Sequence, residues 1–430
     1  MKRFTQSHGT RAAHLATGAA CVVAAMTAAT NAHAVDPTCA SLTNPVYVSG
    51  SSASQSALQA IGGALGAAAT PVTLVYIKSE SCDGVHAVVD PLKVTASAVY
   101  FPGGAAPVAC TLPTVGGQTV DVGVSDVFAT TCPNVTLSAS QKDFQGPIQA
   151  MVFVAHPQST ENVISAEAAR VVLKYANTTT YPVAPWTDVA SIFIRPDGSG
   201  TKYMLGTAAG ITSGWQGTVK AGSKDVLTAV AGAQAAANAS LGILSVSLAD
   251  VNRPGSASAT PVKTLAFQSN GQGGVKQSCG YFPDSTSTSF DKLNVRDGRY
   301  AVWGPLHFVT NVDGTGKPTS ASAPGTGDAS VKTLIDYVTL ATTVAAADKT
   351  KIIDADAASH VVAQCAMRVR RTGEVGAEAS YQPDEPCGCY WESKANGAAP
   401  ASCHACPTGD GDCAGQTGSP KCRYGFCEAK

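Results

Sequence analysis

The chain has 430 residues, of which 14% are charged, and its formal net charge at pH 7 is −1. This length allows two or three domains, and a chain without a basic excess is a poor candidate for a general nucleic-acid-binding protein. The first 34 residues carry three basic and no acidic residues, so the remainder has 26 basic against 30 acidic residues, a net charge of −4.

The N-terminal segment has the pattern of a secretory signal peptide. Basic residues are followed by an Ala-rich apolar stretch (about 15–29), and the small-residue sequence AHA ends at Ala34. We therefore expect residues 1–34 to be removed and the protein to be periplasmic or extracellular. Cys21 raises the alternative of a lipid anchor, although TGAAC lacks the usual Leu three residues earlier. No later apolar run in the sequence reaches the eighteen or so residues of a membrane span.

Residues 45–340 alternate short β-rich runs with Ala-rich helical runs, which predicts an α/β fold with largely parallel sheets. The expected buried strands are VTLVYI (72–77), VDVGVS (120–125), AMVFVA (150–155), ASIFIR (190–195) and LGILSV (241–246). The expected helices cover residues 52–65, 165–176, 226–239 and 331–343.

The composition changes near Pro383, after which seven cysteines lie between positions 387 and 427 and almost no aliphatic residues occur. Such a segment needs covalent or metal crosslinks to fold, and disulfides are the first expectation in an exported protein. We expect these cysteines to be mostly oxidised, with Cys365 as an eighth candidate. Zinc binding through CHAC (403–406) is the alternative.

Thirteen cysteines follow Cys21 in the sequence, and this odd number leaves one free thiol or an intermolecular bridge. Eight cysteines allow 105 pairings, so the connectivity in the C-terminal segment stays open. In the body of the chain we expect Cys110 to pair with Cys132.

Four strand ends gather glycines and hydroxyl residues. They are YVSGSSASQSAL (47–58), YIKSESCDGVHAVV (76–89), VDVGVSDVF (120–128) and IRPDGSGT (194–201). In open α/β sheets, ligands bind outside the carboxyl ends of strands. Helices that begin there leave unpaired N–H groups, which together with the helix dipole favour an anion. Arg195 adds a forked cationic donor that suits phosphate or carboxylate oxygens.

In order and spacing, these four segments resemble the turns of type II periplasmic solute-binding proteins, most closely the phosphate-binding proteins of ABC uptake systems. The resemblance covers about residues 45–345, and it is most specific in RPDGSGT (195–201), which matches an R-x-D-G-S-G-T loop. It implies that Asp197 orients Arg195. The phosphate-binding residues that it implies are Ser54, Ser81, Asp126, Arg195, Ser199, Gly200 and Thr201.

The same resemblance implies a two-lobed type II α/β fold whose lobes are joined by crossovers near 145–150 and 300–306. The first lobe would comprise residues 35–148 and 305–385, the second lobe residues 149–304, and a small disulfide-rich C-terminal segment residues 386–430. The implied function is the capture of an inorganic oxyanion, most closely phosphate, in the cleft between the lobes. The implied partner is an ABC transporter permease, and a monomer without cofactor or metal is expected.

Several positions depart from the family pattern. Glu80 and Asp83 stand where the second turn usually has glycines, which places negative charge near an anion site. Gln55 replaces an aromatic residue, and an extra segment (about 90–118) precedes the strand that ends at Asp126. These departures leave the identity of the anion open.

Each candidate residue also has a plain structural interpretation. Ser54 and Ser81 are suitable helix N-caps, Asp126 suits a turn or a cap, and Arg195 suits a salt bridge either on the surface or between domains. The sequence DGTGKPT (313–319) is predicted to be a polar hairpin turn rather than a phosphate loop, because it lacks a required glycine and its proline would break the following helix.

Two other functions remain open at this point. One is a secreted or surface interaction protein that reuses the fold without transport, since fold alone does not decide function. The other is a phosphatase-like enzyme that would use His86 as a base, although the sequence contains neither H-E-x-x-H nor G-x-S-x-G. A solute-binding protein rather than an enzyme is the expectation.

Overall fold

The computed structural model describes residues 36–175, 182–271, 277–418 and 420–429. The predicted signal peptide and the alternative lipid anchor at Cys21 lie outside these residues. Within the described ranges, we find no helix that is both long enough and apolar enough to span a membrane.

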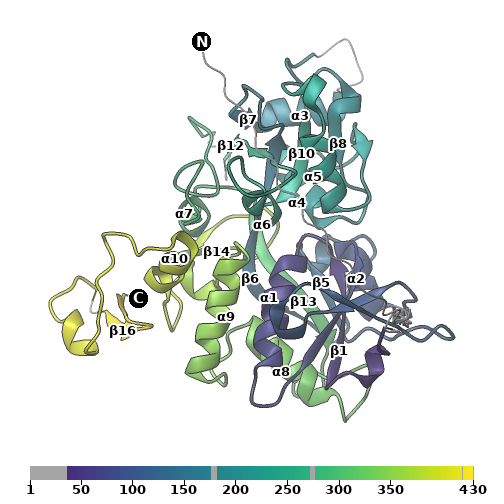
Figure 1. Ribbon diagram of the computed structural model, residues 1–430, viewed down its shortest axis with the longest axis vertical. Helices are drawn as coiled ribbons and strands as arrows, with labels where there is room; N and C mark the ends of the chain where they lie inside the picture. The colour runs from purple at the N-terminus through teal and green to yellow at the C-terminus, as the bar shows by residue number, and fades with distance from the viewer. Residues whose placement is uncertain (1–35, 176–181, 272–276, 419, 430) are drawn as a thin grey trace, which may run out of the picture. The chain divides into compact units, whose positions relative to one another are not determined.

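One hydrogen-bonded sheet connects two groups of elements (Figure 1), with the strand order β4-β3-β2-β1-β5-β13-β6-β10-β8-β9. We call the group around β1 the first lobe and the group around β10 the second lobe. The strands of the first lobe are β1 (Pro45–Ser51), β2 (Thr73–Ser79), β3 (Ala98–Tyr100), β4 (Val108–Cys110) and β5 (Val122–Ser125). Its helices are α1 (Gln55–Gly66), α2 (Ser81–Val89), α8 (Asp328–Val338) and α9 (Ala346–Ala358).

The second lobe has parallel strands at its centre and smaller sheets around them. Its strands are β7 (Val163–Ser165), β8 (Ile192–Ile194), β9 (Thr218–Val219), β10 (Leu241–Ser245), β11 (Lys263–Thr264) and β12 (Ala266–Gln268). Its helices are α3 (Ala166–Tyr175), α4 (Gly200–Ala209), α5 (Ser223–Ala231), α6 (Val246–Val251) and α7 (Leu293–Arg296).

Two long antiparallel strands, β6 (Gln141–Ala155) and β13 (Trp303–Asn311), join the lobes. The first part of β6 pairs with β13 beside the first lobe, and residues 151–154 pair with β10 of the second lobe. The predicted two-lobed α/β fold is therefore confirmed. The prediction of largely parallel sheets is wrong, because β6 and β13 run antiparallel to their neighbours and the extra segment adds the antiparallel strands β3 and β4.

Most predicted elements occur where the sequence pattern placed them, but their lengths differ. Each of the five predicted strands overlaps an observed one, and β6 begins nine residues earlier than its predicted counterpart at 150–155. The predicted helix 226–239 ends as α5 at Ala231, immediately before Gly232. The segment 313–319 is the predicted polar turn, in which Lys317 O accepts from Asp313 N at 2.9 Å. The exact lobe boundaries stay a prediction.

All seven cysteines of the C-terminal segment form disulfides, as expected, and Cys365 is the eighth partner. The predicted Cys110–Cys132 pair is wrong. Cys110 lies at the sheet edge, where it bonds to Cys39, and Cys132 reaches Cys82 on α2. Both cysteines of CHAC are oxidised, and Cys279 is the free cysteine among the described residues. The disulfides of the C-terminal segment are Cys365–Cys387, Cys389–Cys403, Cys406–Cys422 and Cys413–Cys427.

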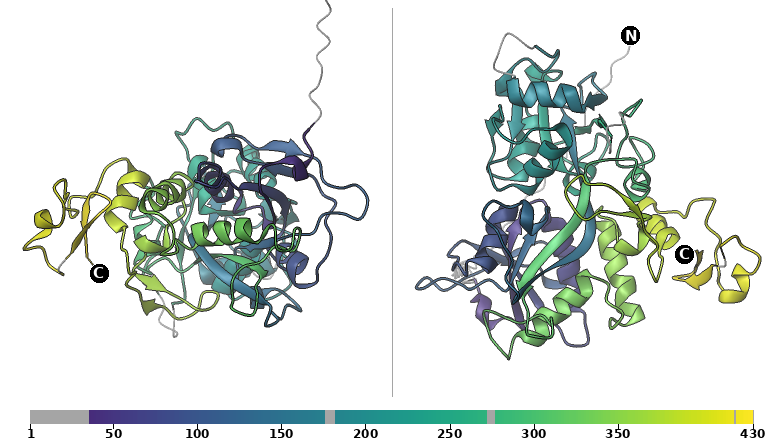
Figure 2. Two further views of the ribbon diagram at one scale, coloured as in Figure 1. Left: turned by 90° about the horizontal axis from the view of Figure 1, so that it is seen from below. Right: turned by 180° about the vertical axis from the view of Figure 1, so that it is seen from behind.

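The C-terminal segment packs beside α9 (Figure 2) through α10 (Gly388–Asn396). Tyr390 donates to Asp354 of α9 at 2.7 Å, and Trp391 is fully buried and donates to Val361 O at 3.1 Å. A short antiparallel pair, β14 (Val369–Arg370) with β15 (Ala379–Ser380), precedes the segment in sequence. A second pair, β16 (Lys421–Arg423) with β17 (Phe426–Glu428), lies after α10 at the end of the segment. The segment is thus anchored to the first lobe by two aromatic side chains.

Close packing of α2 against β1 fixes where the start of α2 lies. A Cβ added at Gly84 would lie 2.4 Å from Ser49 O and 2.6 Å from Gly50 Cα. Backbone atoms cannot move aside as a flexible side chain can, so only glycine allows this approach. By contrast, a Cβ at Gly66, the last residue of α1, would meet nothing within 4 Å.

We expect Gly84→Ala to lower the free energy of unfolding by about 1–3 kcal/mol or more, because overpacking forces α2 away from β1. Gly66→Ala is the matched control and should be neutral or stabilise by up to about 1 kcal/mol, since alanine is the better helix former. Chemical denaturation of both variants measures the difference. Equal stability of the two variants would contradict the close approach of α2 and β1.

Candidate functional site

Four helices begin at one place between the lobes. In the first lobe, α1 follows the end of β1 at Ser51 and α2 begins at Ser81; in the second lobe, α4 begins at Gly200 and α5 at Ser223. The partial positive charges of these helix N-termini gather where the chain also places acidic and hydroxyl side chains. We call the residues at this place the interlobe cluster: Ser51, Ser52, Glu80, Ser81, Asp126, Arg195, Gly200 and Ser223.

Asp126 forms the floor of the interlobe cluster, directly after β5. Its side chain is buried, and its Oδ2 accepts hydrogen bonds from Ser51 Oγ at 2.5 Å and from Ser81 Oγ at 3.1 Å. Its Oδ1 is also buried and has no hydrogen-bond partner among the described residues. Burial raises the pKa of Asp126, while the two serine hydrogen bonds and the charge of Arg195 act in the opposite direction.

Direct hydrogen bonds join the two lobes at the starts of α2 and α4. Gly200 N donates to Ser81 Oγ at 3.1 Å, and Cys82 N donates to Gly198 O at 3.1 Å. A Cβ at Gly200 would lie 2.5 Å from Ser81 Oγ and 2.7 Å from Asp126 Cβ. The lobes therefore meet so closely here that glycine is required at position 200.

Arg195 lies above Asp126 and is 1% exposed. Its Nη1 donates to Ser223 Oγ at 2.6 Å and to Ser52 Oγ at 3.1 Å. Its Nη2 donates to Glu80 Oε1 at 2.5 Å and to Ala221 O at 3.2 Å. Its Nε is buried and has no hydrogen-bond partner in the part of the chain that the structure describes.

Glu80 is the acidic residue that departs from the family pattern, and the structure shows its contact. It is the N-cap of α2, where it forms a capping box with Asp83, and its carboxylate forms an ion pair with Arg195 of the other lobe. Burial raises the pKa of Glu80, and the charge and hydrogen bond of Arg195 lower it. The carboxylate of Glu80 thus binds the guanidinium as an anionic ligand would.

The structure brings together four of the predicted residues: Ser81, Asp126, Arg195 and Gly200. Ser54 is buried nearby, but its hydroxyl donates to Ser51 O at 2.8 Å rather than to a cluster side chain. Ser199 and Thr201 are buried at the start of α4. All seven predicted binding residues are therefore at the lobe junction, and their role in binding stays a proposal.

The predicted role of Asp197 is wrong. Its side chain is 96% exposed and pairs with Lys202 at 2.7 Å, so it does not orient Arg195. Glu80 takes that position instead, because the turn that carries it lies directly opposite Arg195.

Sequence reasoning missed three serines of the interlobe cluster. Ser51 and Ser52 precede the predicted Ser54 in the same turn, and Ser223 follows Gly222 at the start of α5. The three serines of GSSAS (50–54) are a signal for several hydroxyl contacts, but only the turn geometry decides which one faces Asp126.

His86, the candidate base for an enzyme, has other contacts. Its Nδ1 lies 2.6 Å from Asp90 Oδ2, and its Nε2 lies 3.0 Å from Pro133 O. His86 and Asp90 lie toward the opposite end of α2 from Ser81, so the contacts of His86 do not favour a catalytic role in the interlobe cluster.

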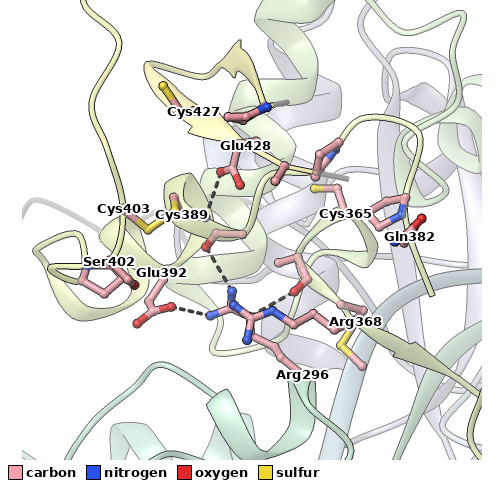
Figure 3. Close-up of a pocket in the computed structure, with 18 of the residues that line it drawn as sticks. Arg296, Cys365, Arg368, Gln382, Cys389, Glu392, Ser402, Cys403, Cys427 and Glu428 are labelled. Carbon is pink, nitrogen blue, oxygen red and sulfur yellow. Dashed lines mark hydrogen bonds and ion pairs between the residues drawn. A yellow bond between two sulfur atoms is a disulfide. The ribbon is translucent and has the colours of Figure 1, made fainter. Parts of the chain in front are cut away.

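A cavity of about 580 Å³ lies elsewhere, between the C-terminal segment and the body (Figure 3). Its buried Arg296 donates to Glu392 at 2.6 Å, to Ala366 O at 3.0 Å and to Gly388 O at 3.3 Å. Glu428 accepts from the N-terminus of α10. Arg296 therefore connects the segment to the body, whereas Glu428 holds β17 against α10 within the segment.

Comparisons with known proteins find solved structures of low similarity to this chain. No family model and no curated protein matches the chain. Among solved structures, a putative phosphate ABC transporter substrate-binding protein with bound phosphate from Clostridium perfringens is 13% identical, with a TM-score of 0.47, over 74% of this chain and 99% of that chain. An ABC-type phosphate transport receptor from Vibrio cholerae is 11% identical, with a TM-score of 0.43, over 74% and 99%.

Similarity at this level also extends to a protein of another kind. The reduced form of the OxyR regulatory domain from Pseudomonas aeruginosa is 9% identical, with a TM-score of 0.36, over 68% of this chain and 96% of that chain. These values assign no function. The class that the chain's own topology and interlobe cluster define is a two-lobed α/β protein with a buried polar site between its lobes and a disulfide-rich C-terminal segment.

The ion pair between Glu80 and Arg195 can be tested by a double-mutant cycle. Arg195→Met should cost about 3–5 kcal/mol of unfolding free energy, because it leaves Glu80 without its partner in a largely buried site. The double variant with Glu80→Gln should cost less than the sum of the single variants by about 2–3 kcal/mol.

Lys202→Met provides the control at the start of the neighbouring helix α4, because it breaks an ion pair with the exposed Asp197. We expect it to cost about 1 kcal/mol or less. Denaturant titration measures the wild type and the four variants, and strictly additive effects of the Arg195 and Glu80 changes would show that the ion pair does not hold the lobes together.

Proposed function

We propose that the chain is an exported solute-binding protein that captures an inorganic oxyanion, with phosphate as the first candidate, between its two lobes. The observation that supports this most directly is the convergence of Arg195 with the N-termini of α2, α4 and α5. Helix N-termini and a guanidinium are the two groups that proteins most often present to phosphate oxygens. The periplasmic or extracellular location, a monomeric state and delivery to an ABC transporter permease are parts of the same proposal.

Entry of an anion requires the lobes to part, because the donors of the interlobe cluster are hydrogen-bonded to one another. Opening along β6 and β13 would separate Arg195 from Glu80 and Gly200 N from Ser81. An anion would then replace the Glu80 carboxylate at Arg195 and accept hydrogen bonds from Ser52, Ser81 and Ser223. Hinge closure around the ligand would restore the contacts between the lobes.

Asp126 supplies a reason for selectivity between oxyanions. Phosphate near neutral pH still carries a proton and can donate a hydrogen bond to a carboxylate, which is worth roughly 1.5–3 kcal/mol. Sulfate carries no proton, so its lone pairs would face a buried negative charge, which costs about 3–5 kcal/mol. The unpartnered Oδ1 of Asp126 is the acceptor through which the site would recognise a protonated anion.

Titration calorimetry with phosphate, sulfate, a phosphonate and small carboxylates tests the proposal. We expect roughly micromolar binding of phosphate, or about −8 kcal/mol, and sulfate binding weaker by on the order of a thousandfold. If no anion in the series gives a heat of binding, the proposed function is contradicted. Equal binding of sulfate and phosphate would show that Asp126 is not the selecting group.

The variant Asp126→Asn should weaken phosphate binding only modestly, because the amide oxygen still accepts the phosphate proton. It should strengthen sulfate binding, since the amide N–H can donate and the repulsion is gone. Because Glu80 adds a second carboxylate, we expect the full gain for sulfate only in the double variant with Glu80→Gln. Ser159→Ala is a control at a buried serine of the second lobe that lies outside the interlobe cluster and accepts from Glu161 N in its own turn, and it should leave the ratio of the two affinities unchanged.

A second candidate function is a secreted interaction protein that uses the fold without transport. The observation in its favour is that Glu80 already neutralises Arg195, so the charge of the guanidinium is balanced within the chain. Small-angle scattering distinguishes the two functions. A solute-binding protein should become more compact on addition of phosphate, whereas an interaction protein should give the same profile with and without every anion.

A further inference from the structure

The chain continues past α9 into a segment that crosses both connecting strands. We call residues 362–381 the strap. At its start, Val362 exchanges two backbone hydrogen bonds with Ile148 of β6, at 2.7 and 2.9 Å. Further on, Gln364 donates to Gly146 O at 2.7 Å, which adds a side-chain contact to the same part of β6.

The strap is also bonded to β13 and to the second lobe. Arg371 Nη1 donates to Ala301 O at 2.9 Å and to Trp303 O at 3.2 Å, and its guanidinium lies 3.8 Å from the centre of the Trp303 ring. Glu378 accepts from both Arg371 and Trp303. The side chain of Arg371 therefore fixes the strap against the connecting strands just before the turn at Gly373.

That turn inserts Glu374 beside the interlobe cluster. Phe128 N donates to Glu374 Oε1 at 2.6 Å, and Phe128 lies two residues after Asp126. A Cβ built at Gly304 would lie 3.9 Å from Glu374 Oε2 and 3.8 Å from Asp126 O, so the Glu374 carboxylate and the backbone of Asp126 both approach Gly304 of β13. Glu374 Oε2 is buried without a hydrogen-bond partner among the residues described.

The turn 125–128 makes contacts within itself and with β13, and Glu374 joins it to the strap. Ser125 Oγ accepts from Val127 N at 3.1 Å, which bends the chain after β5. The ring of Phe128 packs on His307 at 4.2 Å between ring centres, and His307 in turn contacts Asp143 of β6. Within the part of the chain that the structure describes, the backbone N–H of Phe128 donates to the strap alone, and this bond fixes the chain just after Asp126, whose own N–H donates to Ser81 Oγ at 3.3 Å.

We propose that Glu374 is a positioning residue of the oxyanion site, through which the strap holds the turn 126–128 and so keeps the Asp126 carboxylate beside Ser51 and Ser81. The expected effect of Glu374 on anion binding rests on the proposed function. Glu374 gives a late segment of the chain a role at the site between the lobes, since the strap contains Cys365 of the disulfide to Cys387.

The charges around Glu374 make its effect dependent on pH. Burial raises the pKa of Glu374 to about 6, with the backbone hydrogen bond from Phe128 and the charges of His307 and Arg371 opposing this rise and the charge of Asp126 adding to it. Asp143 and Glu378 pair with His307 and Arg371, respectively. Above about pH 6 Glu374 is a carboxylate and accepts strongly; below that pH it is neutral and accepts from Phe128 N more weakly.

The first test does not need a ligand. Amide hydrogen exchange is measured on the full chain for the wild type, Glu374→Ala and Glu374→Gln, with Glu385→Ala as the control because Glu385 is a partly exposed acid of the same extension that pairs with Lys349. We expect the amides of both Phe128 and Asp126 to exchange at least tenfold faster in Glu374→Ala and at nearly wild-type rates in Glu374→Gln and the control. Unchanged protection of the Asp126 amide would overturn the positioning role, whatever the protein binds.

The second test measures phosphate binding by calorimetry at pH 7.5 and pH 5. At pH 7.5 we expect Glu374→Ala to weaken binding about tenfold and Glu374→Gln about threefold or less, since the amide oxygen still accepts from Phe128 N. The ratio of wild-type to Glu374→Gln affinity should fall to about one at pH 5, and this ratio is independent of the protonation of phosphate itself.

Equal affinities of the wild type and Glu374→Ala at pH 7.5 would overturn the proposal. Absence of phosphate binding in the wild type would instead contradict the proposed function, and the exchange rates of the Asp126 and Phe128 amides would still decide the positioning role.

Discussion

The arrangement of the two lobes depends on the burial of one cation. Arg195 is 1% exposed and belongs to the second lobe, yet the acid that neutralises it, Glu80, belongs to the first. A buried guanidinium without a counterion is strongly unfavourable, so separation of the lobes must be accompanied by solvent or by another anion at Arg195. This single constraint connects the closed arrangement of the lobes to the chemistry that the site can perform.

The other groups of the interlobe cluster follow from that constraint. Asp126 lies near Arg195 without touching it, and its charge is supported by two serine hydroxyls instead of by a salt bridge. Gly200 permits the starts of α2 and α4 to meet, which brings hydroxyl and N–H donors from both lobes within hydrogen-bond distance. The site is therefore polar and buried, most of its donors are already bonded within the chain, and a ligand has to replace contacts that the protein already makes.

The C-terminal extension adds a second connection between the lobes. The strap contacts β6, β13 and the turn after Asp126, and Arg296 of the second lobe binds both Ala366 of the strap and Glu392 of α10. Disulfides hold the segment beyond it, which has too few apolar residues to fold by burial alone. An extension of this kind restricts hinge motion, because opening of the lobes must either carry the strap along or break its contacts on one side.

The sequence alone determined the α/β class, the disulfide-rich segment and the turns that form the site, because these depend on local periodicity, cysteine content and short glycine-rich motifs. It identified Arg195, Ser81, Asp126 and Gly200, which share a strand-end pattern. Tertiary structure decided the rest. Glu80 rather than Asp197 pairs with Arg195, and Cys39 rather than Cys132 pairs with Cys110. Glu374 reaches Phe128 from 246 residues away. All three contacts join segments that are distant in sequence, so they follow only from how the sheets and lobes pack.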